Sequence, residues 1–313
     1  MGTASLHLDA WSLAWRVFWD KLAPRCSHRD CSCRQSFWRR LRGQRGAIRL
    51  RGARYCVDHC LERALTDLLP HTRFASRRGL APHRIPLGLV LLSRQQLTEH
   101  QLRTALTAQQ AAGRGRIGEW LQTLGFASEL QVTAALARQW SCPVLRVHSD
   151  SPSAGIAAAG NVGAPQIPLT LLASFAMIPV DFVAARATLH IAFGEAIDYG
   201  VLYAIEQMMG CHTDPCMAVP SYVRQKLQAL SQRRGESEVV FDRVADPAEF
   251  ARIVRSYCVR VAASEVSLAA CGPYLWVRLS RPSGLPLDLL LREPPDGGGP
   301  ASVPPRSVSI PAF

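Results

Sequence analysis

The feature that most constrains the fold is an internal repeat with a period of thirty residues, between positions 87 and 139. Apolar, glycine, acidic and glutamine positions recur in step, which is the signature of two copies of one supersecondary unit. Under a shift of thirty residues, Leu87, Gly88, Leu91, Glu99, Leu102, Ala105, Leu106 and Gln109 fall on Ile117, Gly118, Leu121, Glu129, Val132, Ala135, Leu136 and Gln139.

Each copy of the repeat predicts a short helix, a turn and a longer helix. Thr98 with Gln101, and Ser128 with Gln131, form capping boxes, in which each side chain satisfies an unpaired amide at a helix start. Gly113 suits the end of the first long helix. Because apolar residues recur three and four positions apart, the two copies can bury their apolar faces against each other.

The rest of the chain divides around this repeat pair, and we expect an α+β multidomain protein. Connectors are expected at 63–82, at the Ser-, Gly-, Ala- and Pro-rich residues 147–165 and at the polar residues 231–240. The predicted parts are an amphipathic N-terminal helix over 1–24, an Arg- and Cys-rich zinc-like module over 25–62, the helical repeat pair over 83–146, a small α/β unit over 166–232, an α+β subdomain over 241–293 and a disordered tail over 294–313.

Changes of hydrophobic period and turn residues predict the elements of the two later parts. The α/β unit is expected to hold strands over 177–183, 188–193 and 216–219, a helix from Asp198 to Gly210 and a helix over 221–230. The last subdomain is expected to open with a helix capped by Asp246-Pro247. Strands over 265–270, 274–280 and 285–292 follow it.

Five cysteines gather within the Arg-rich module, and their spacing suggests a metal site. Two lie four residues apart, so one helical turn places both thiolates on the same side. A predicted hairpin over 48–55 separates them from the others, and four thiolates are a set that zinc prefers. The candidate ligands are Cys26, one of Cys31 or Cys33, Cys56 and Cys60; the alternative is that these are scattered structural cysteines.

The charge of the chain is concentrated in the same module. Residues 25–54 hold ten Arg against one Asp, a net of +9 within a total of +12. Such a patch can meet phosphates, acidic lipid headgroups or an acidic protein face. Trp11, Trp15 and Trp19 precede it on the predicted N-terminal helix, which either contacts a membrane interface peripherally or covers the core of the next module.

Neither a transmembrane helix nor a signal peptide is predicted, because charged residues interrupt every apolar run. We therefore place the chain in the cytoplasm, with peripheral contact at the inner membrane through the N-terminal helix as an option. A phosphate-cradling loop is also missing, since Lys21 and Lys226 are the only lysines and neither follows a Gly-rich turn. We expect a protein that is not an enzyme and neither binds nor hydrolyses ATP.

The repeat resembles a known family. Residues Arg116-Ile117-Gly118, with Leu121, Gly125 and Gln139, are similar to the Arg-Leu-Gly…Leu…Gly…Gln pattern of the N-terminal domain of type II secretion system protein E and of the type IV pilus ATPases. The resemblance covers about residues 83–230, and 246–292 resemble a degenerate form of the domain that follows. The chain lacks the ATPase core of that family.

What the resemblance implies is a cyclic di-GMP site lined by both repeats, and secretion or pilus proteins as partners. The residues implied are Arg116, Ile117, Gly118, Leu121, Gly125, Gln139, Leu87, Gly88, Leu91 and Gln109. Pro86 stands at the Arg position of the first repeat and Gln95 at its second Gly position, so we expect weak or absent binding, with any residual affinity dependent on Arg116. The alternative is that the two glycines only form tight turns between packed helices.

These observations lead to a non-catalytic regulatory or adaptor protein, built like the N-terminal region of a secretion or pilus ATPase. The alternative from another class is a nucleic-acid-binding zinc protein, with the repeat as a dimerisation unit. Although the Arg-rich module could contact phosphates, ten Arg can equally form a solvated face, and we consider nucleic acid the less favoured partner.

Overall fold

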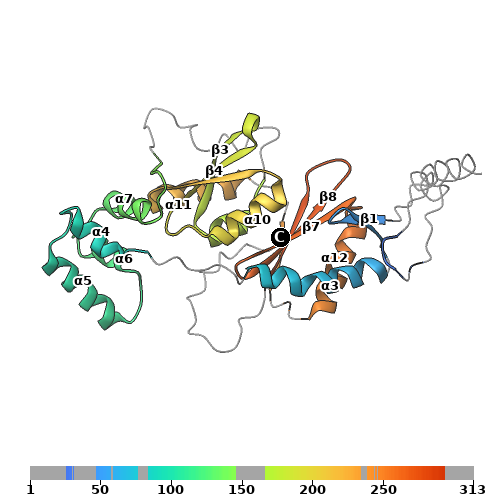
Figure 1. Cartoon of the computed structure of the whole chain (residues 1–313), viewed down its shortest axis with the longest axis horizontal. Helices are drawn as coiled ribbons and strands as arrows, with labels where there is room; N and C mark the ends of the chain where they lie inside the picture. The colour runs from blue at the N-terminus through green and yellow to red at the C-terminus, as the bar shows by residue number, and fades with distance from the viewer. Residues whose placement is uncertain are drawn as a thin grey trace, which may run out of the picture. The chain divides into compact units, whose positions relative to one another are not determined.

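The computed structural model describes residues 26–29, 31, 47–57, 59–76, 84–145, 166–233, 238–242, 244 and 246–292. The predicted N-terminal helix, Cys33, the linker 147–165 and the tail 294–313 lie outside these residues. The chain forms two compact units. Unit 1 joins residues up to 78 to residues 236–296, and unit 2 is built from residues 79–235 (Figure 1).

Unit 1 is built on a six-stranded sheet with the strand order β2-β1-β7-β8-β9-β6. The strands are β1 (Ala47–Leu50), β2 (Ala53–Cys56), β6 (Glu238–Phe241), β7 (Glu265–Cys271), β8 (Tyr274–Ser280) and β9 (Leu287–Arg292). The predicted hairpin is therefore present, as β1 and β2. However, β1 also pairs in parallel with β7, and β6 pairs in parallel with β9.

This sheet differs from the predicted layout in two respects. Segments 25–62 and 241–293, predicted as separate parts, contribute strands to one sheet. Residues 238–240, predicted as part of a linker, begin the edge strand β6, whose Glu238 pairs with Asp288 of β9. Both differences arise from strand pairing between segments far apart in the sequence, which local patterns do not encode.

One face of the sheet carries α3 (His59–Ser76) and α12 (Pro247–Arg260). The prediction of a connector over 63–82 was wrong, because α3 spans most of it. Leu61, Leu65 and Leu69 recur every four residues and are fully buried against the sheet and α12. Pro70, inside the helix, disguised this pattern in the sequence.

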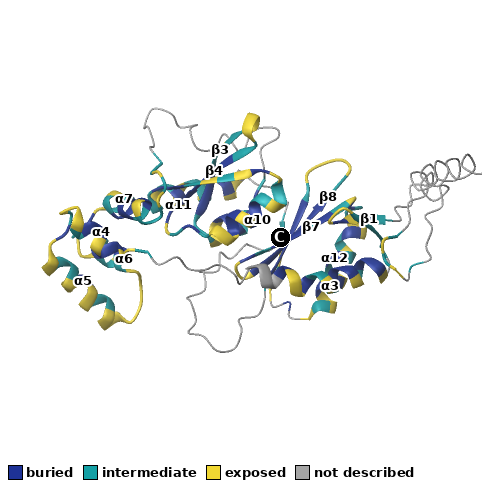
Figure 2. Ribbon diagram, in the orientation of Figure 1, coloured by how far each residue is buried: buried dark blue, intermediate teal, exposed yellow. Residues whose placement is uncertain are grey.

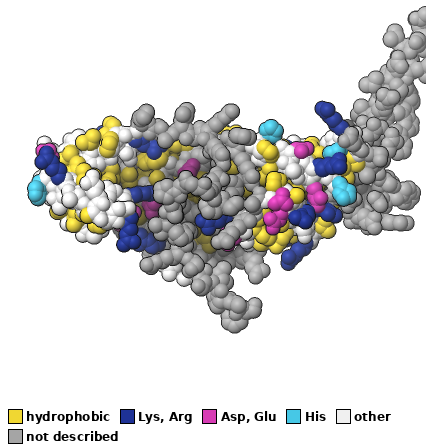
Figure 3. Space-filling model, turned by 90° about the horizontal axis from the view of Figure 1, so that it is seen from below, with side chains coloured by type: hydrophobic (Ala, Val, Ile, Leu, Met, Phe, Trp, Pro, Cys, Tyr) yellow, Lys and Arg dark blue, Asp and Glu magenta, His cyan; other side chains and the backbone are white. Residues whose placement is uncertain are grey.

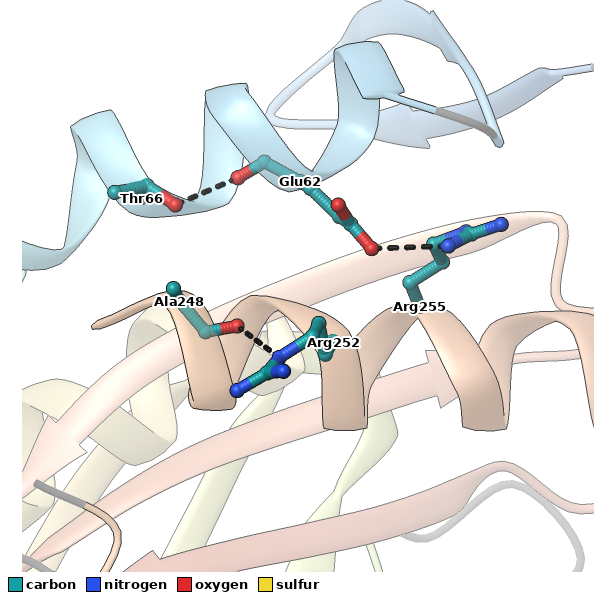
Figure 4. Close-up of polar contacts among 5 residues, drawn as sticks. All are labelled: Glu62, Thr66, Ala248, Arg252 and Arg255. Atoms are coloured by element: carbon teal, nitrogen blue, oxygen red, sulfur yellow. Dashed lines mark hydrogen bonds and ion pairs between the residues drawn. The ribbon is translucent and has the colours of Figure 1, made fainter. Parts of the chain in front are cut away.

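Polar contacts support the packing of these two helices. The Glu62 carboxylate of α3 forms an ion pair with the Arg255 guanidinium of α12, at 3.1 Å (Figure 4). Asp246 caps α12 as predicted, since its carboxylate accepts from the backbone N–H of Ala248 at 3.0 Å. The helices thus reach each other through a shared apolar core and one partly buried ion pair.

Unit 2 begins with the repeat pair, whose four helices match the predicted units. They are α4 (Leu87–Ser93), α5 (Glu99–Ala112), α6 (Ile117–Thr123) and α7 (Glu129–Gln139). Both predicted capping boxes are present, and Gly113 ends α5 in the left-handed conformation. Gly88 and Gly118 are packing positions, because an added Cβ would lie 2.6 Å from Leu102 and 3.0 Å from Val132, respectively.

The α/β part of unit 2 has a three-stranded sheet in the order β3-β4-β5. Its elements are α9 (Leu169–Ser174), β3 (Met177–Val183), a 3₁₀ turn (Ala184–Arg186), β4 (Thr188–Phe193), α10 (Tyr199–Met209), β5 (His212–Met217) and α11 (Pro220–Arg233). The third strand begins four residues before its predicted start. Among the contacts that join this part to the repeat pair, Val144 bridges to Met217, and Glu129 accepts from the hydroxyl of Ser221 at 2.6 Å.

Burial and surface chemistry agree with an α+β multidomain protein, as predicted. Figure 2 shows buried residues along the strands and along the inner faces of the helices. On the face drawn in Figure 3, basic, acidic and apolar side chains are interspersed over the described elements. Among the described helices, we find none with the length and apolar character that a membrane span requires.

The repeat also predicts a stability difference that can be measured. Gln95 and Gly125 occupy equivalent turns with φ of +57° and +70°, and only glycine adopts this conformation without strain. Gln95 is exposed, so Gln95→Gly should raise the free energy of unfolding by about 1 kcal/mol, and Gly125→Gln should lower it by about as much. Urea unfolding of both variants checks this. Changes of the same sign in the two variants would contradict the strain argument.

Candidate functional site

Four cysteines converge in unit 1 from three short segments. Cys26 and Cys31 lie in the loop before the hairpin, Cys56 ends β2, and Cys60 is in the first turn of α3. Their sulfur atoms all lie within 4.8 Å of one another, and the Cys31 and Cys56 sulfurs are 3.9 Å apart. Four sulfurs bound tetrahedrally to zinc at about 2.3 Å are separated by about 3.8 Å, so this arrangement fits that ion.

Backbone contacts hold the loop of this cluster against the hairpin. Ser27 donates its N–H to the Arg54 carbonyl at 2.7 Å, and Arg54 donates its own N–H to the Ser27 hydroxyl at 3.1 Å. The Cys56 N–H points at the Cys26 sulfur at 3.4 Å, a contact that stabilises a thiolate. Cys31 belongs to this cluster, whereas Cys33 lies outside the described residues.

The cluster is unusual for metal-free thiols because its members are partly buried together. Burial raises the pKa of the Cys56 thiol, and burial with the neighbouring cysteines raises the pKa of Cys60. Such groups are costly to ionise alone, whereas a bound cation compensates their charge. The donor set, the spacing and the N–H contact all suit one thiophilic ion.

A second candidate site lies in unit 2, where the two repeats meet the α/β part. The repeats are related by reciprocal bonds: Gln109 donates its amide to the Gly115 carbonyl at 2.8 Å, and Gln139 donates to the Ile85 carbonyl at 2.6 Å. The acceptors precede α6 and α4 and are themselves thirty residues apart. These bonds fix the two loops that carry Arg116 and its counterpart, Pro86.

Beside these loops is a cleft of about 470 Å³. Its charged and aromatic lining residues are Arg84, Arg116, Trp140, Phe175, Glu195, Asp198 and Tyr199. The Arg84 guanidinium lies over the Trp140 ring, 3.0 Å from its centroid, and the Trp140 and Tyr199 rings are 6.0 Å apart. Arg116 forms a 2.8 Å ion pair with Glu195. The cleft therefore combines two guanidinium groups and two carboxylates with three aromatic side chains.

The cleft contains two guanidinium groups, Arg84 and Arg116, and two carboxylates, Glu195 and Asp198. The start of α10 opens into it, and Asp198 accepts from the Gly200 and Val201 amides there, at 2.8 and 3.1 Å. Helix N-termini attract negative charge. Partial burial lowers the pKa of Arg84, which nevertheless stays protonated at neutral pH because the guanidinium pKa is so high. An incoming anion would compete with Glu195 for Arg116.

The ten residues that the resemblance implied as ligand contacts take different places. Arg116 lines the cleft. Gln109 and Gln139 make the reciprocal bonds, and Gly125 lies in the turn after α6. The other six, Leu87, Gly88, Leu91, Ile117, Gly118 and Leu121, belong to the core between the repeats or to the packing of the short helices.

Of the lining residues, sequence reasoning predicted only Arg116 as a site residue; those that it missed include Arg84, Trp140, Glu195 and Tyr199. Arg84 lies two residues before Pro86, so a strict period of thirty overlooks it. Trp140 directly follows Gln139, and this adjacency was the one available signal. Glu195 and Tyr199 come from the α/β part, and no local pattern connects them with the repeat.

Comparison with known proteins gives matches among solved structures. No family model matches the chain, and no curated protein matches it. A structure described as MshE with cdg is 26% identical and covers 47% of this chain and 99% of its own, with a TM-score of 0.35. Two crystal forms of the N-terminal domain of XpsE are each 19% identical, cover 45% and 44% of this chain and 91% and 89% of their own, and give TM-scores of 0.33 and 0.26.

The resemblance drawn from the sequence is confirmed to this extent. The chain is similar to MshE and to an XpsE N-terminal domain over just under half of its length. All three TM-scores are below 0.5, so these matches carry no conclusion about function.

Proposed function

We propose that this chain is a non-catalytic regulatory or adaptor protein whose repeat unit binds cyclic di-GMP weakly in the cleft of unit 2. The observation that carries the proposal is the placement of Arg84 and Arg116 beside Trp140 and Tyr199. Guanidinium groups pair with phosphates and stack on purine rings, and aromatic rings stack on bases. One of the similar structures is described as MshE with cdg.

The cleft contains groups that bind and orient an anion. Arg116 belongs to the repeat pair and Glu195 to the α/β part, so their ion pair links the two parts of unit 2. A phosphate that takes Arg116 from Glu195 would loosen this link. Binding can in this way become a structural change that a partner protein detects.

The proposed partners are components of secretion or pilus machinery. This part of the proposal is supported by the resemblance of the repeat to that family. An affinity pull-down from the native cytosol tests it directly.

We also propose that the four cysteines Cys26, Cys31, Cys56 and Cys60 hold one structural zinc ion. The bound ion would supply charge compensation for four thiolates, and the protein would supply the tetrahedral set and the Cys56 N–H contact. The ion would fasten the loop over 26–31 and the start of α3 to the hairpin. Segments this short have little core of their own, so a metal contributes strongly to their order.

The zinc site can be tested by metal analysis. Protein purified without added zinc should contain about one equivalent. Cys26→Ser should lose the metal and lower the melting temperature, whereas Cys142→Ser, which changes a cysteine outside the cluster, should retain it. Metal-free native protein in which all ten thiols titrate readily would rule out the site.

Cyclic di-GMP binding can be tested by calorimetry on the full chain. We expect weak binding, and Arg116→Ala should reduce it about tenfold to a hundredfold, because a charge-assisted contact is lost. Glu195→Gln should strengthen binding, since it removes the competing carboxylate. Arg103→Ala is the matched control, because that guanidinium pairs with Glu99 on α5 and does not line the cleft.

Two outcomes would contradict the proposal. Tight binding that Arg116→Ala leaves unchanged would place the site elsewhere in the chain. A wild-type protein and a Glu195→Gln variant that both fail to bind would show that the cleft takes a different ligand.

A further inference from the structure

The hairpin β1–β2 carries three arginines in positions that oppose local stability. Arg51 and Gly52 form its tip with φ of +49° and +80°, the backbone of a type I′ turn. Asparagine is favoured at the first of these positions, and a long side chain there is strained. The sequence nevertheless places an exposed arginine at this tip.

The second arrangement that opposes stability is a like-charged pair across the strands. Arg49 and Arg54 are directly opposite each other in the β1–β2 register. Like charges in this relation repel and destabilise a hairpin. Glu265 is the β7 residue opposite Arg49, yet none of the three hairpin arginines forms an ion pair with a carboxylate in the described part of the chain.

The other face of the hairpin explains why it forms despite these costs. Ile48 and Leu50 are buried in the core of unit 1, and Tyr55 packs against that core. The loop over 26–31 adds the backbone bonds between Ser27 and Arg54. The hairpin is thus anchored through Ile48 and Leu50, while Arg49, Arg51 and Arg29 are exposed and Arg54 is half-buried.

Residues that break local rules without a gain in folding are expected at functional positions. We propose that the arginine face of the hairpin, Arg49, Arg51 and Arg54, is a docking surface for a membrane that contains anionic phospholipids. Guanidinium groups pair with lipid phosphates, and basic residues near an anionic bilayer add their attractions together.

Two observations favour a membrane over a nucleic acid. The aromatic residue of the hairpin, Tyr55, faces the core and is not available to stack on bases. In the sequence, Trp11, Trp15 and Trp19 recur every four residues shortly before Cys26, a pattern typical of interfacial helices. Stable attachment to a bilayer takes two signals, of which a basic surface is one.

The test is sedimentation of the full chain with vesicles of phosphatidylcholine alone and of an equimolar mixture with phosphatidylglycerol. We expect binding to the mixed vesicles only, and its loss at high salt. Arg51→Asn and Arg54→Thr should each weaken this binding roughly fivefold, as expected for one basic residue at an anionic surface. Arg186→Asn makes the same charge change at an exposed site in unit 2 and should have little effect.

Folding of the variants is followed in parallel by thermal unfolding. Arg51→Asn should unfold at a higher temperature than the wild type, because asparagine relieves the strain at the tip. Weaker binding by a more stable protein cannot be attributed to misfolding.

Several results would overturn the proposal. They are equal binding to both kinds of vesicle, no binding to either, or binding that the hairpin changes leave intact. Arginine-dependent binding to duplex DNA without binding to vesicles would likewise overturn it and assign the surface to nucleic acid.

Discussion

The apolar faces of the two repeats have to be covered by each other, and the arrangement of unit 2 depends on this constraint. Leu91 and Leu121 are fully buried in one shared core, and Gly88 and Gly118 allow the short helices to approach the long ones closely. Once the repeats are paired, each glutamine reaches the loop before the short helix of the other repeat. This pairing fixes the loop that carries Arg116 at the edge of the cleft.

The cleft exists because the repeat pair and the α/β part hold each other through polar contacts. The pairs are Glu129 with Ser221 and Arg116 with Glu195. The first pair secures the packing of α7 against the start of α11. The second lies in the cleft itself, where a bound anion would disturb it. The Arg116 guanidinium therefore pairs with the α/β part through Glu195 and is also the group proposed to bind the ligand.

In unit 1, the N-terminal segment is integrated with the end of the chain. The hairpin joins β7 through a short parallel pairing, and α3 packs on α12 beside the Glu62–Arg255 ion pair. The four cysteines lie where the loop, the hairpin and α3 meet. A zinc ion there would stabilise the hairpin that presents the arginines, so the metal and the proposed docking surface depend on the same few residues.

Local patterns predicted much of this structure. The capping boxes located α5 and α7, Asp246-Pro247 located α12, and β3 and β4 were predicted at their observed bounds. The cysteine spacing predicted a cluster because the four cysteines lie in two short stretches of sequence, 26–31 and 56–60. The repeat predicted Arg116 as a binding residue, and Arg116 lies in the cleft.

The features that were missed depend on distant parts of the chain or on local conflicts. The β1–β7 and β6–β9 pairings join segments that share no local signal, and Pro70 concealed α3. Glu195 and Tyr199 reach the cleft only through the packing of the α/β part against the repeats. Arg84 was overlooked because the equivalent of Arg116 was sought at one fixed spacing.

The central claim is that the cleft of unit 2 is a ligand site for cyclic di-GMP. Hydrogen–deuterium exchange of the full chain, with and without this ligand, tests it most directly. The account predicts slower exchange in the loops over 84–86 and 115–116 and at the start of α10, with unit 1 unchanged. Unchanged exchange in these three segments at saturating ligand, or protection confined to unit 1, would contradict it.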